Sequence, residues 1–272
     1  MVQIERLSIE LTERCGKGCG FCYNGSNRSG DTDWTEADLG AFVVDCAAHG
    51  VKAFSFGGGE PLEAPELLWP VLEVLRGTAF RSMTTNGLLL DRAIVQQLAD
   101  AAIDKVHVSI HNPRDRDEVE RVIAQVGELA AAGIRSGVNL LVRHSNVADA
   151  RAAAAALHAA GIDNRRIVYL PMRGTDTPTP KMIGEVAAGP FQSMTCLTAC
   201  GESPRFVSLS ARRTVARCSY TIARRPLALP TYAAMLAALD NLELIDCADD
   251  KGGLVKLGRI SAATVATDRS RA

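Results

Sequence analysis

Three cysteines near the start of the chain, Cys15, Cys19 and Cys22, have the spacing C-x3-C-x2-C. They lie in a glycine-rich segment, which allows the backbone to turn tightly around a compact group. Thiolates are ligands that soft metal centres prefer. A structural zinc site, or an iron–sulfur cluster held entirely by protein, takes four ligands. Three cysteines therefore indicate a cluster with one open iron, with a zinc site or a redox relay of thiols as the alternatives.

The other cysteines lie far downstream, apart from Cys46. The chain has eight cysteines in all, too few for a disulfide scaffold and too clustered to be scattered core thiols. Cys196, Cys200, Cys218 and Cys247 form the downstream group, which indicates a second metal site, with a zinc site or buried thiols as the alternatives. Cys46 lies beside apolar residues in a helical pattern, and we expect it to be a buried core thiol.

The segments that must position these cysteines alternate between short apolar runs and Ala-rich amphipathic runs. Strands separated by helices of this length form βα units with a parallel sheet. Six units are too few for a complete eight-unit barrel, so we expect an open, partial (β/α)6 TIM-type barrel, with its chemistry at the carboxyl ends of the strands. The expected strands are Glu5–Leu11, Val51–Phe56, Phe80–Thr84, Lys105–Ile110, Ser136–Val142 and Ile167–Leu170. Three of the expected helices are Thr35–Gly50, Arg116–Ala132 and Ala148–Ala160.

The alternation breaks at Pro171–Pro190, whose prolines and glycines are typical of a linker. Beyond it, two short runs flanking Ser210–Arg213 predict a β-hairpin, and Thr231–Leu239 predicts a short helix. We therefore expect three parts, which are a partial barrel over residues 1–175, a small α+β extension over residues 176–260 and a flexible tail over residues 261–272.

The cysteine spacing after the first strand resembles that of the radical S-adenosylmethionine (SAM) superfamily. Further motifs resemble those of the family at the ends of later strands. Gly58-Gly59-Glu60-Pro61 matches its GGE motif, and Thr84-Thr85-Asn86-Gly87 resembles its TNG element. The remaining matching positions are Phe21, Ser109, His111 and Asn139. His111 departs from the acidic residue that is more common in the family at that position.

The resemblance implies a role for each of these positions. Cys15, Cys19 and Cys22 would hold a [4Fe–4S] cluster whose open iron chelates SAM. The GGE motif, Gly58-Gly59-Glu60, would bind the methionine amino group. One electron from the reduced cluster would split SAM into methionine and a 5′-deoxyadenosyl radical, which abstracts hydrogen from a substrate. The SAM contacts implied outside the GGE motif are Phe21 beside the adenine, with Thr85, Asn86, Ser109, His111 and Asn139.

The downstream cysteines resemble the C-terminal extensions called Twitch and SPASM in this superfamily. The resemblance implies one auxiliary [4Fe–4S] cluster on Cys196, Cys200 and Cys218, because the chain has too few cysteines for a full SPASM extension. Cys247 is the candidate for the fourth ligand. Without a fourth ligand, the cluster would have an open iron that could bind substrate.

Six arginines without an acidic residue among them occupy the segment 205–225. Arginine forks suit carboxylates and phosphates, so some of these side chains are candidates for binding an anionic substrate. A solvated basic surface is the alternative. The substrate candidates are Arg173, Arg205 and Arg217.

The overall composition argues against several other classes of function. The 272 residues carry a net charge of −1, which does not favour a nucleic-acid binder. The N-terminus shows no secretory signal, and no apolar run is long enough to span a membrane. We therefore expect a cytoplasmic protein without nucleic-acid or membrane partners. The resemblance to the radical SAM superfamily implies an enzyme reduced by an external one-electron donor of the flavodoxin or ferredoxin type.

Three functions remain open from the sequence. The first is a radical SAM enzyme acting on a small polar metabolite, with an anionic one as a candidate, in a specialised-metabolite or antibiotic pathway. The second is a peptide-modifying enzyme that makes a crosslink, an epimer or an oxidised residue. Such relatives often carry an extra leader-binding domain, for which this chain has no room, so the metabolite is favoured. The third is a non-enzymatic electron-transfer protein, which would not need the GGE motif.

Overall fold

The computed structural model describes residues 3–193 and 205–242. Within these ranges the strands form one sheet of ten, in the order β10-β9-β8-β1-β2-β3-β4-β5-β6-β7. Neighbouring strands from β8 to β7 are parallel, and the pairs β8–β9 and β9–β10 are antiparallel. The strands are β1 (Arg6–Thr12), β2 (Ala53–Gly58), β3 (Phe80–Thr85), β4 (Lys105–Ile110), β5 (Arg135–Val142), β6 (Ile167–Pro171), β7 (Gln192–Ser193), β8 (Phe206–Leu209), β9 (Thr214–Ala216) and β10 (Arg225–Pro226).

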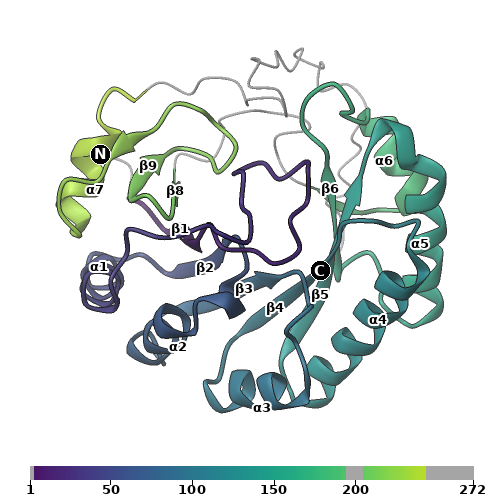
Figure 1. The fold of residues 1–272 in the computed structure, drawn as a ribbon, viewed down its shortest axis with the longest axis horizontal. Helices are drawn as coiled ribbons and strands as arrows, with labels where there is room; N and C mark the ends of the chain where they lie inside the picture. Colours follow the sequence, from purple (N-terminus) through teal and green to yellow (C-terminus); the bar gives the residue numbers. More distant parts are fainter. Residues whose placement is uncertain (1–2, 194–204, 243–272) are drawn as a thin grey trace, which may run out of the picture.

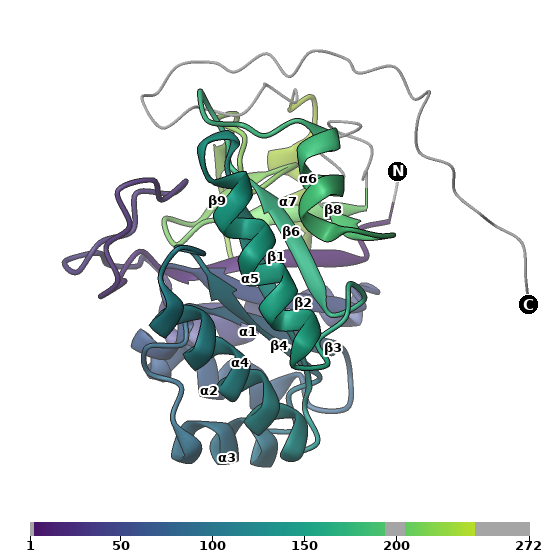
Figure 2. The same cartoon turned by 90° about the vertical axis from the view of Figure 1, so that its right-hand side faces the viewer.

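Each of the strands β1 to β6 is followed by a helix, and these helices lie along the outer side of the curved sheet (Figures 1 and 2). The two edge strands do not pair with each other, so the expected open barrel of six βα units is confirmed. No helix in the described ranges has the length and apolar character needed to cross a membrane. The helices are α1 (Glu36–Ala48), η1 (Pro61–Glu63), α2 (Pro65–Val74), α3 (Arg92–Asp100), α4 (Arg116–Ala131), η2 (His144–Asn146), α5 (Val147–Ala159), α6 (Pro180–Ala187) and α7 (Tyr232–Leu239).

The helix starts follow local capping chemistry. The Thr35 side chain accepts a hydrogen bond from the Asp38 N–H at the start of α1, as its position predicts. Thr231 caps α7 in the same way. Cys46 on α1 is fully buried among apolar side chains, which confirms the expected core thiol, and burial raises the pKa of this thiol.

The expected linker Pro171–Pro190 is wrong in its second half, because that half contains α6. Thr179 caps this helix, and Pro180 occupies its first turn, where the missing N–H of proline costs no hydrogen bond. Ile183 and Val186 on α6 are buried in the core. The prolines of this segment therefore mark a helix start, and α6 completes the sixth βα unit.

The segment beyond residue 205 extends the barrel sheet. The predicted hairpin is confirmed, since β8 and β9 pair antiparallel. In addition, β8 pairs parallel with β1, with Phe206 opposite Arg6. The strand that carries the cysteine loop therefore has a neighbour on each side, β2 and β8. The boundary at residue 175 stays a prediction, and the expected tail 261–272 lies outside the described residues, as do Cys196, Cys200 and Cys247.

Candidate functional site

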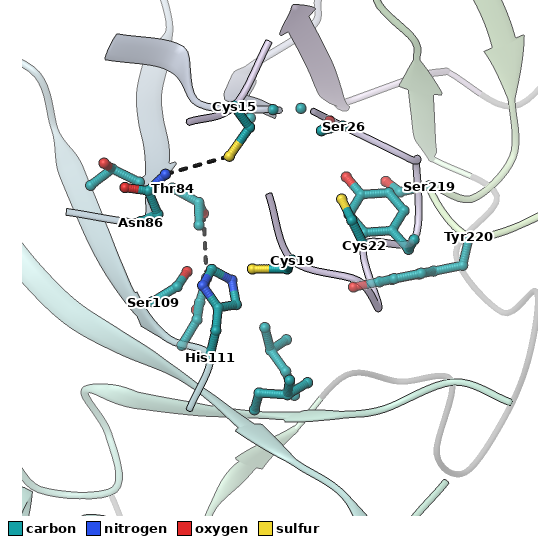
Figure 3. A pocket seen from close by; sticks show the side chains of 18 of the residues that line it. Cys15, Cys19, Cys22, Ser26, Thr84, Asn86, Ser109, His111, Ser219 and Tyr220 are labelled. Atoms are coloured by element: carbon teal, nitrogen blue, oxygen red, sulfur yellow. Dashed lines mark hydrogen bonds between the residues drawn. The ribbon is translucent and has the colours of Figure 1, made fainter. Parts of the chain in front are cut away.

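A cavity of about 600 Å³ opens at the carboxyl ends of the barrel strands. The side chains of all three cysteines of the N-terminal loop line it (Figure 3). The structure therefore brings together residues that the sequence places on separate strands and loops. The predicted site residues that line this cavity are Cys15, Cys19, Cys22, Phe21, Gly58, Gly59, Thr85, Asn86, Ser109, His111, Asn139 and Arg173.

Backbone hydrogen bonds fix the path of the cysteine loop. The Cys15 N–H donates to the Asn27 carbonyl at 2.8 Å, and the Cys22 N–H donates to the Cys19 carbonyl at 3.1 Å. Gly18 has a φ of 58°, a left-handed conformation that favours glycine. The Asn86 side-chain amide lies 3.5 Å from the Cys15 sulfur, so the loop after β3 meets the cysteine loop directly (Figure 3).

The chemistry of the three thiols suits a soft metal centre. They are half-buried, and burial raises the pKa of Cys19, an effect that the nearby Lys17 opposes. A metal that binds such a thiol displaces its proton. Within the described ranges, no group of three or more His, Cys, Asp or Glu side chains is gathered as the ligands of a single ion. Three cysteine sulfurs that line one cavity of about 600 Å³ fit an iron–sulfur cluster.

Two glycines at the end of β2 allow a close approach of backbone to the cysteine loop. The Gly59 N–H donates to the Thr12 carbonyl at 2.7 Å. A Cβ atom on Gly59 would lie 2.1 Å from the Arg14 carbonyl oxygen, and Gly58 has a φ of 109°. Since Arg14 directly precedes Cys15, these glycines set the position of the first cysteine against β2.

The carboxylate of Glu60 does not line the cavity. It is fully buried and accepts hydrogen bonds from the Thr85 hydroxyl at 2.8 Å, the Asn86 N–H at 2.7 Å and the Leu62 N–H at 3.2 Å. The structure thus places this side chain under the turn after β3, which it holds in place. Burial raises the pKa of Glu60 to about 7.

The raised pKa of Glu60 predicts a pH-dependent effect of the substitution Glu60→Gln. The native pKa of about 7 exceeds the ordinary value of 4.5. This group therefore contributes stability that is fully present below about pH 4.5 and is lost as pH rises through 7. Relative to the variant, the wild-type protein should lose on the order of 3 kcal/mol of unfolding free energy between pH 5 and pH 8.

Urea unfolding of the metal-free proteins at both pH values measures this change. Glu66→Gln, at an exposed position on α2, is the control. Its unfolding free energy should differ from that of the wild type by the same amount at pH 5 and at pH 8. A Glu60→Gln difference that does not vary with pH would contradict the prediction.

Two histidines, His107 within β4 and His111 just after it, are neutral at pH 7. Burial lowers the pKa of His107 and of His111 to about 4 in each case. His107 Nδ1 lies 2.8 Å from Asn139 Oδ1, which orients the Asn139 amide. His111 Nδ1 is buried without a hydrogen-bond partner among the described residues, and its ring lies 6.1 Å from that of Phe21. The cavity wall here offers neutral polar groups, which suit the hydroxyl and amide groups of a ligand.

A stack of side chains above the cavity has no motif in the sequence. The loop after β9 carries Tyr220, which Figure 3 shows at the cavity. The ring centroids of Tyr220 and Tyr23 lie 4.8 Å apart. The guanidinium carbon of Arg173, which is buried, lies 5.1 Å from the centroid of the Tyr220 ring. The Tyr23 hydroxyl donates to Glu10 at 3.2 Å. Tyr23 and Tyr220 line the cavity, as does Lys17 of the cysteine loop. No sequence motif identified these three residues.

The other arginine candidates lie elsewhere. Arg205 forms an exposed ion pair with Glu5, and Arg217 donates to two backbone carbonyls near the end of α7. Neither lines the cavity. Cys218 is half-buried, and its sulfur lies 3.5 Å from the Tyr220 N–H. Of the three arginine candidates, the structure brings only Arg173 to the cysteines.

Comparison with known protein families agrees with this site. The family model of the Radical SAM superfamily matches residues 9–178, more than half of the chain. The chain belongs to the radical SAM superfamily. Membership makes it an enzyme and implies a 4Fe–4S cluster and SAM as its cofactors. The alternative of a non-enzymatic electron-transfer protein is therefore wrong.

Curated relatives within the superfamily include two kinds of cyclase. A protein of Methanopyrus kandleri called "Probable GTP 3',8-cyclase" is 32% identical over 108 residues, which is 40% of this chain and 34% of the relative. The PqqA peptide cyclase of Gluconobacter oxydans is 28% identical over 157 residues, which is 52% of this chain and 42% of the relative. In both cases the match covers less than half of the relative.

Solved structures of other radical SAM proteins share the fold. Streptococcus suis SuiB bound to S-adenosylmethionine has a TM-score of 0.66 at 13% identity, covering 88% of this chain and 67% of that one. The protein anSMEcpe, with bound AdoMet and a Cp18Cys peptide, has a TM-score of 0.65 at 14% identity, covering 88% of this chain and 80% of that one. At these identities the likeness concerns the fold alone.

Proposed function

We propose that this radical SAM enzyme abstracts hydrogen from a small anionic metabolite. The observation that carries the proposal is the buried guanidinium of Arg173 on the cavity wall, stacked against Tyr220. Cys15, Cys19 and Cys22 hold the cluster. When bound and reduced, the cluster would supply the one electron that splits SAM into methionine and the hydrogen-abstracting 5′-deoxyadenosyl radical.

The neighbouring residues bind and orient SAM in this proposal. Gly58 and Gly59 line the cavity in close contact with the segment before Cys15, and the Asn86 side-chain amide lies 3.5 Å from the Cys15 sulfur. Glu60 acts indirectly, by holding the turn that presents Thr85 and Asn86. The residues assigned to the adenosine side of the cavity are Phe21, Ser109, His111 and Asn139.

The charges on the cavity wall favour an anionic substrate. Among the described residues that line the cavity, the cationic side chains are Lys17 and Arg173, and none is acidic. Lys17 is engaged in an ion pair with Glu118. The planar guanidinium of Arg173 has the geometry that suits a carboxylate or phosphate. Because Arg173 is buried and stacked on Tyr220, its guanidinium is held in a defined orientation.

The proposal includes a second 4Fe–4S cluster on Cys196, Cys200 and Cys218, with Cys247 as a further candidate ligand. Cys218 supports it, because this thiol contacts Tyr220 and so lies next to the substrate side of the cavity. A cluster there would accept an electron from a substrate radical or anchor the substrate. After anaerobic reconstitution, two such clusters predict about eight irons and eight sulfides per chain, and about four would refute the second cluster.

A peptide substrate is the second candidate. The observation that favours it is the similarity to a protein named PqqA peptide cyclase. In this case the cavity would receive one side chain of a peptide, and Arg173 would contact an acidic residue of that peptide.

Hydrogen abstraction from deuterated metabolites separates the two candidates. Reconstituted enzyme is incubated with SAM, dithionite and an extract of cells grown in D₂O, divided into an anionic small-molecule fraction and a peptide fraction. Mass spectrometry detects deuterium in the 5′-deoxyadenosine. We expect deuterium from the small-molecule fraction, and its loss in Arg173→Gln. The exposed Arg165→Gln variant is the control and should retain it. Deuterium from the peptide fraction alone would favour the second candidate.

A further inference from the structure

An ion pair joins the cysteine loop to helix α4. Lys17, which lies between Cys15 and Cys19, places its Nζ 2.8 Å from Glu118 Oε1 on α4. The side chains are only 15% and 7% exposed. Losing one partner of a buried pair leaves an uncompensated charge in a poorly solvated place, which is much more costly than losing a surface pair.

The same carboxylate oxygen has a second partner. Glu118 Oε1 also accepts the His111 N–H at 2.6 Å, just beyond the end of β4. The Glu118 backbone is held in turn by the capping side chain of Asp115, which accepts its N–H at 3.3 Å. One oxygen atom, fixed in the first turn of α4, therefore connects the cysteine loop with the end of β4.

Both connected segments carry cavity residues. Lys17 lies between Cys15 and Cys19 in the sequence, and all three side chains line the cavity. The His111 ring lies 6.1 Å from the ring of Phe21, which belongs to the cysteine loop. A shift at Lys17 therefore moves thiols, while a shift at His111 moves the wall on which we place the adenosine of SAM. An ion pair with only a general stabilising role would have no preferential effect on the thiols.

We propose that Glu118 is a positioning residue that locks the cysteine loop against the end of β4. It keeps the cluster and the SAM-binding wall in register, although its own side chain does not line the cavity. The inference rests on the cluster and SAM sites of the proposed function and is independent of which substrate binds.

The variant Glu118→Gln tests this proposal, with Glu120→Gln as the matched control at an exposed position on the same helix. Reconstituted protein is challenged with an iron chelator, and the rate of iron release is followed by absorbance. We expect release at least about tenfold faster in Glu118→Gln. Addition of SAM should also change the EPR spectrum of the reduced cluster less in Glu118→Gln than in the wild type. Glu120→Gln should match the wild type, and Glu118→Asp, which retains the charge, should recover part of the loss.

Two further results keep the test decisive. If Glu118→Gln does not fold, the double variant Lys17→Met with Glu118→Gln, which has no lone buried charge, is used in its place and should show the same fast iron release. Wild-type iron release from the folded Glu118 variant, or from the folded double variant, would overturn the proposal. A wild-type protein that binds no cluster would instead refute the proposed function, so the two failures are distinguishable.

Discussion

Replacing Cys19 by alanine is expected to reduce 5′-deoxyadenosine formation from SAM to background. Cys19 is one of three cysteines of the N-terminal loop that line the cavity. Without it, two irons of the cluster would have no cysteine ligand, and we expect such a cluster to be lost. The measurement is chromatographic detection of 5′-deoxyadenosine after anaerobic incubation with dithionite.

Cys46→Ala provides the matched control for this experiment. Cys46 is fully buried on α1 and does not line the cavity, so the substitution changes core packing without removing a ligand. We expect it to retain its cluster absorbance and 5′-deoxyadenosine formation. Activity that survives in Cys19→Ala would refute the assignment of the cluster to this loop.

Gly59→Ala should damage the site without removing any ligand. The added Cβ would lie 2.1 Å from the Arg14 carbonyl oxygen, so either β2 or the cysteine loop must shift. Overpacking of this kind costs about 1–3 kcal/mol of unfolding free energy, measured by urea unfolding of the metal-free protein. Because Arg14 precedes Cys15, we also expect the iron content after reconstitution to fall by at least about half.

Gly40→Ala on α1 is the control for this substitution. A Cβ at Gly40 would meet no atom within 4 Å, and alanine favours a helix, so the variant should be at least as stable as wild type. If Gly59→Ala kept both the unfolding free energy and the iron content of the wild type, the close approach would have no role in the site.

The βα core could be predicted closely because each of its elements has a local signal. β4 is observed over the predicted range Lys105–Ile110, and α1 begins after the predicted cap Thr35. The segment that holds α6 shows where such signals mislead. Its prolines and glycines indicate a linker, whereas Pro180 marks the first turn of a helix whose short apolar face packs on the core.

The motif residues could be located from the sequence, but the orientation of each side chain could not. Glu60 has the expected position after β2, yet its carboxylate turns away from the cavity because three donors satisfy it beneath the next loop. Contacts between distant segments had no signal at all. Neither the stack of Tyr220 on Arg173 nor the pair of Lys17 with Glu118 leaves a pattern in spacing or composition.

The pairing of β8 with β1 has a consequence for when the enzyme becomes able to accept its cluster. β1 leads directly into the cysteine loop, and one of its two neighbours comes from the opposite end of the described chain. During synthesis the cysteines leave the ribosome early, while β8 follows only after all six βα units. We therefore expect cluster insertion to wait until β8 has been synthesised and has paired with β1, so that nascent chains keep their thiols exposed until then.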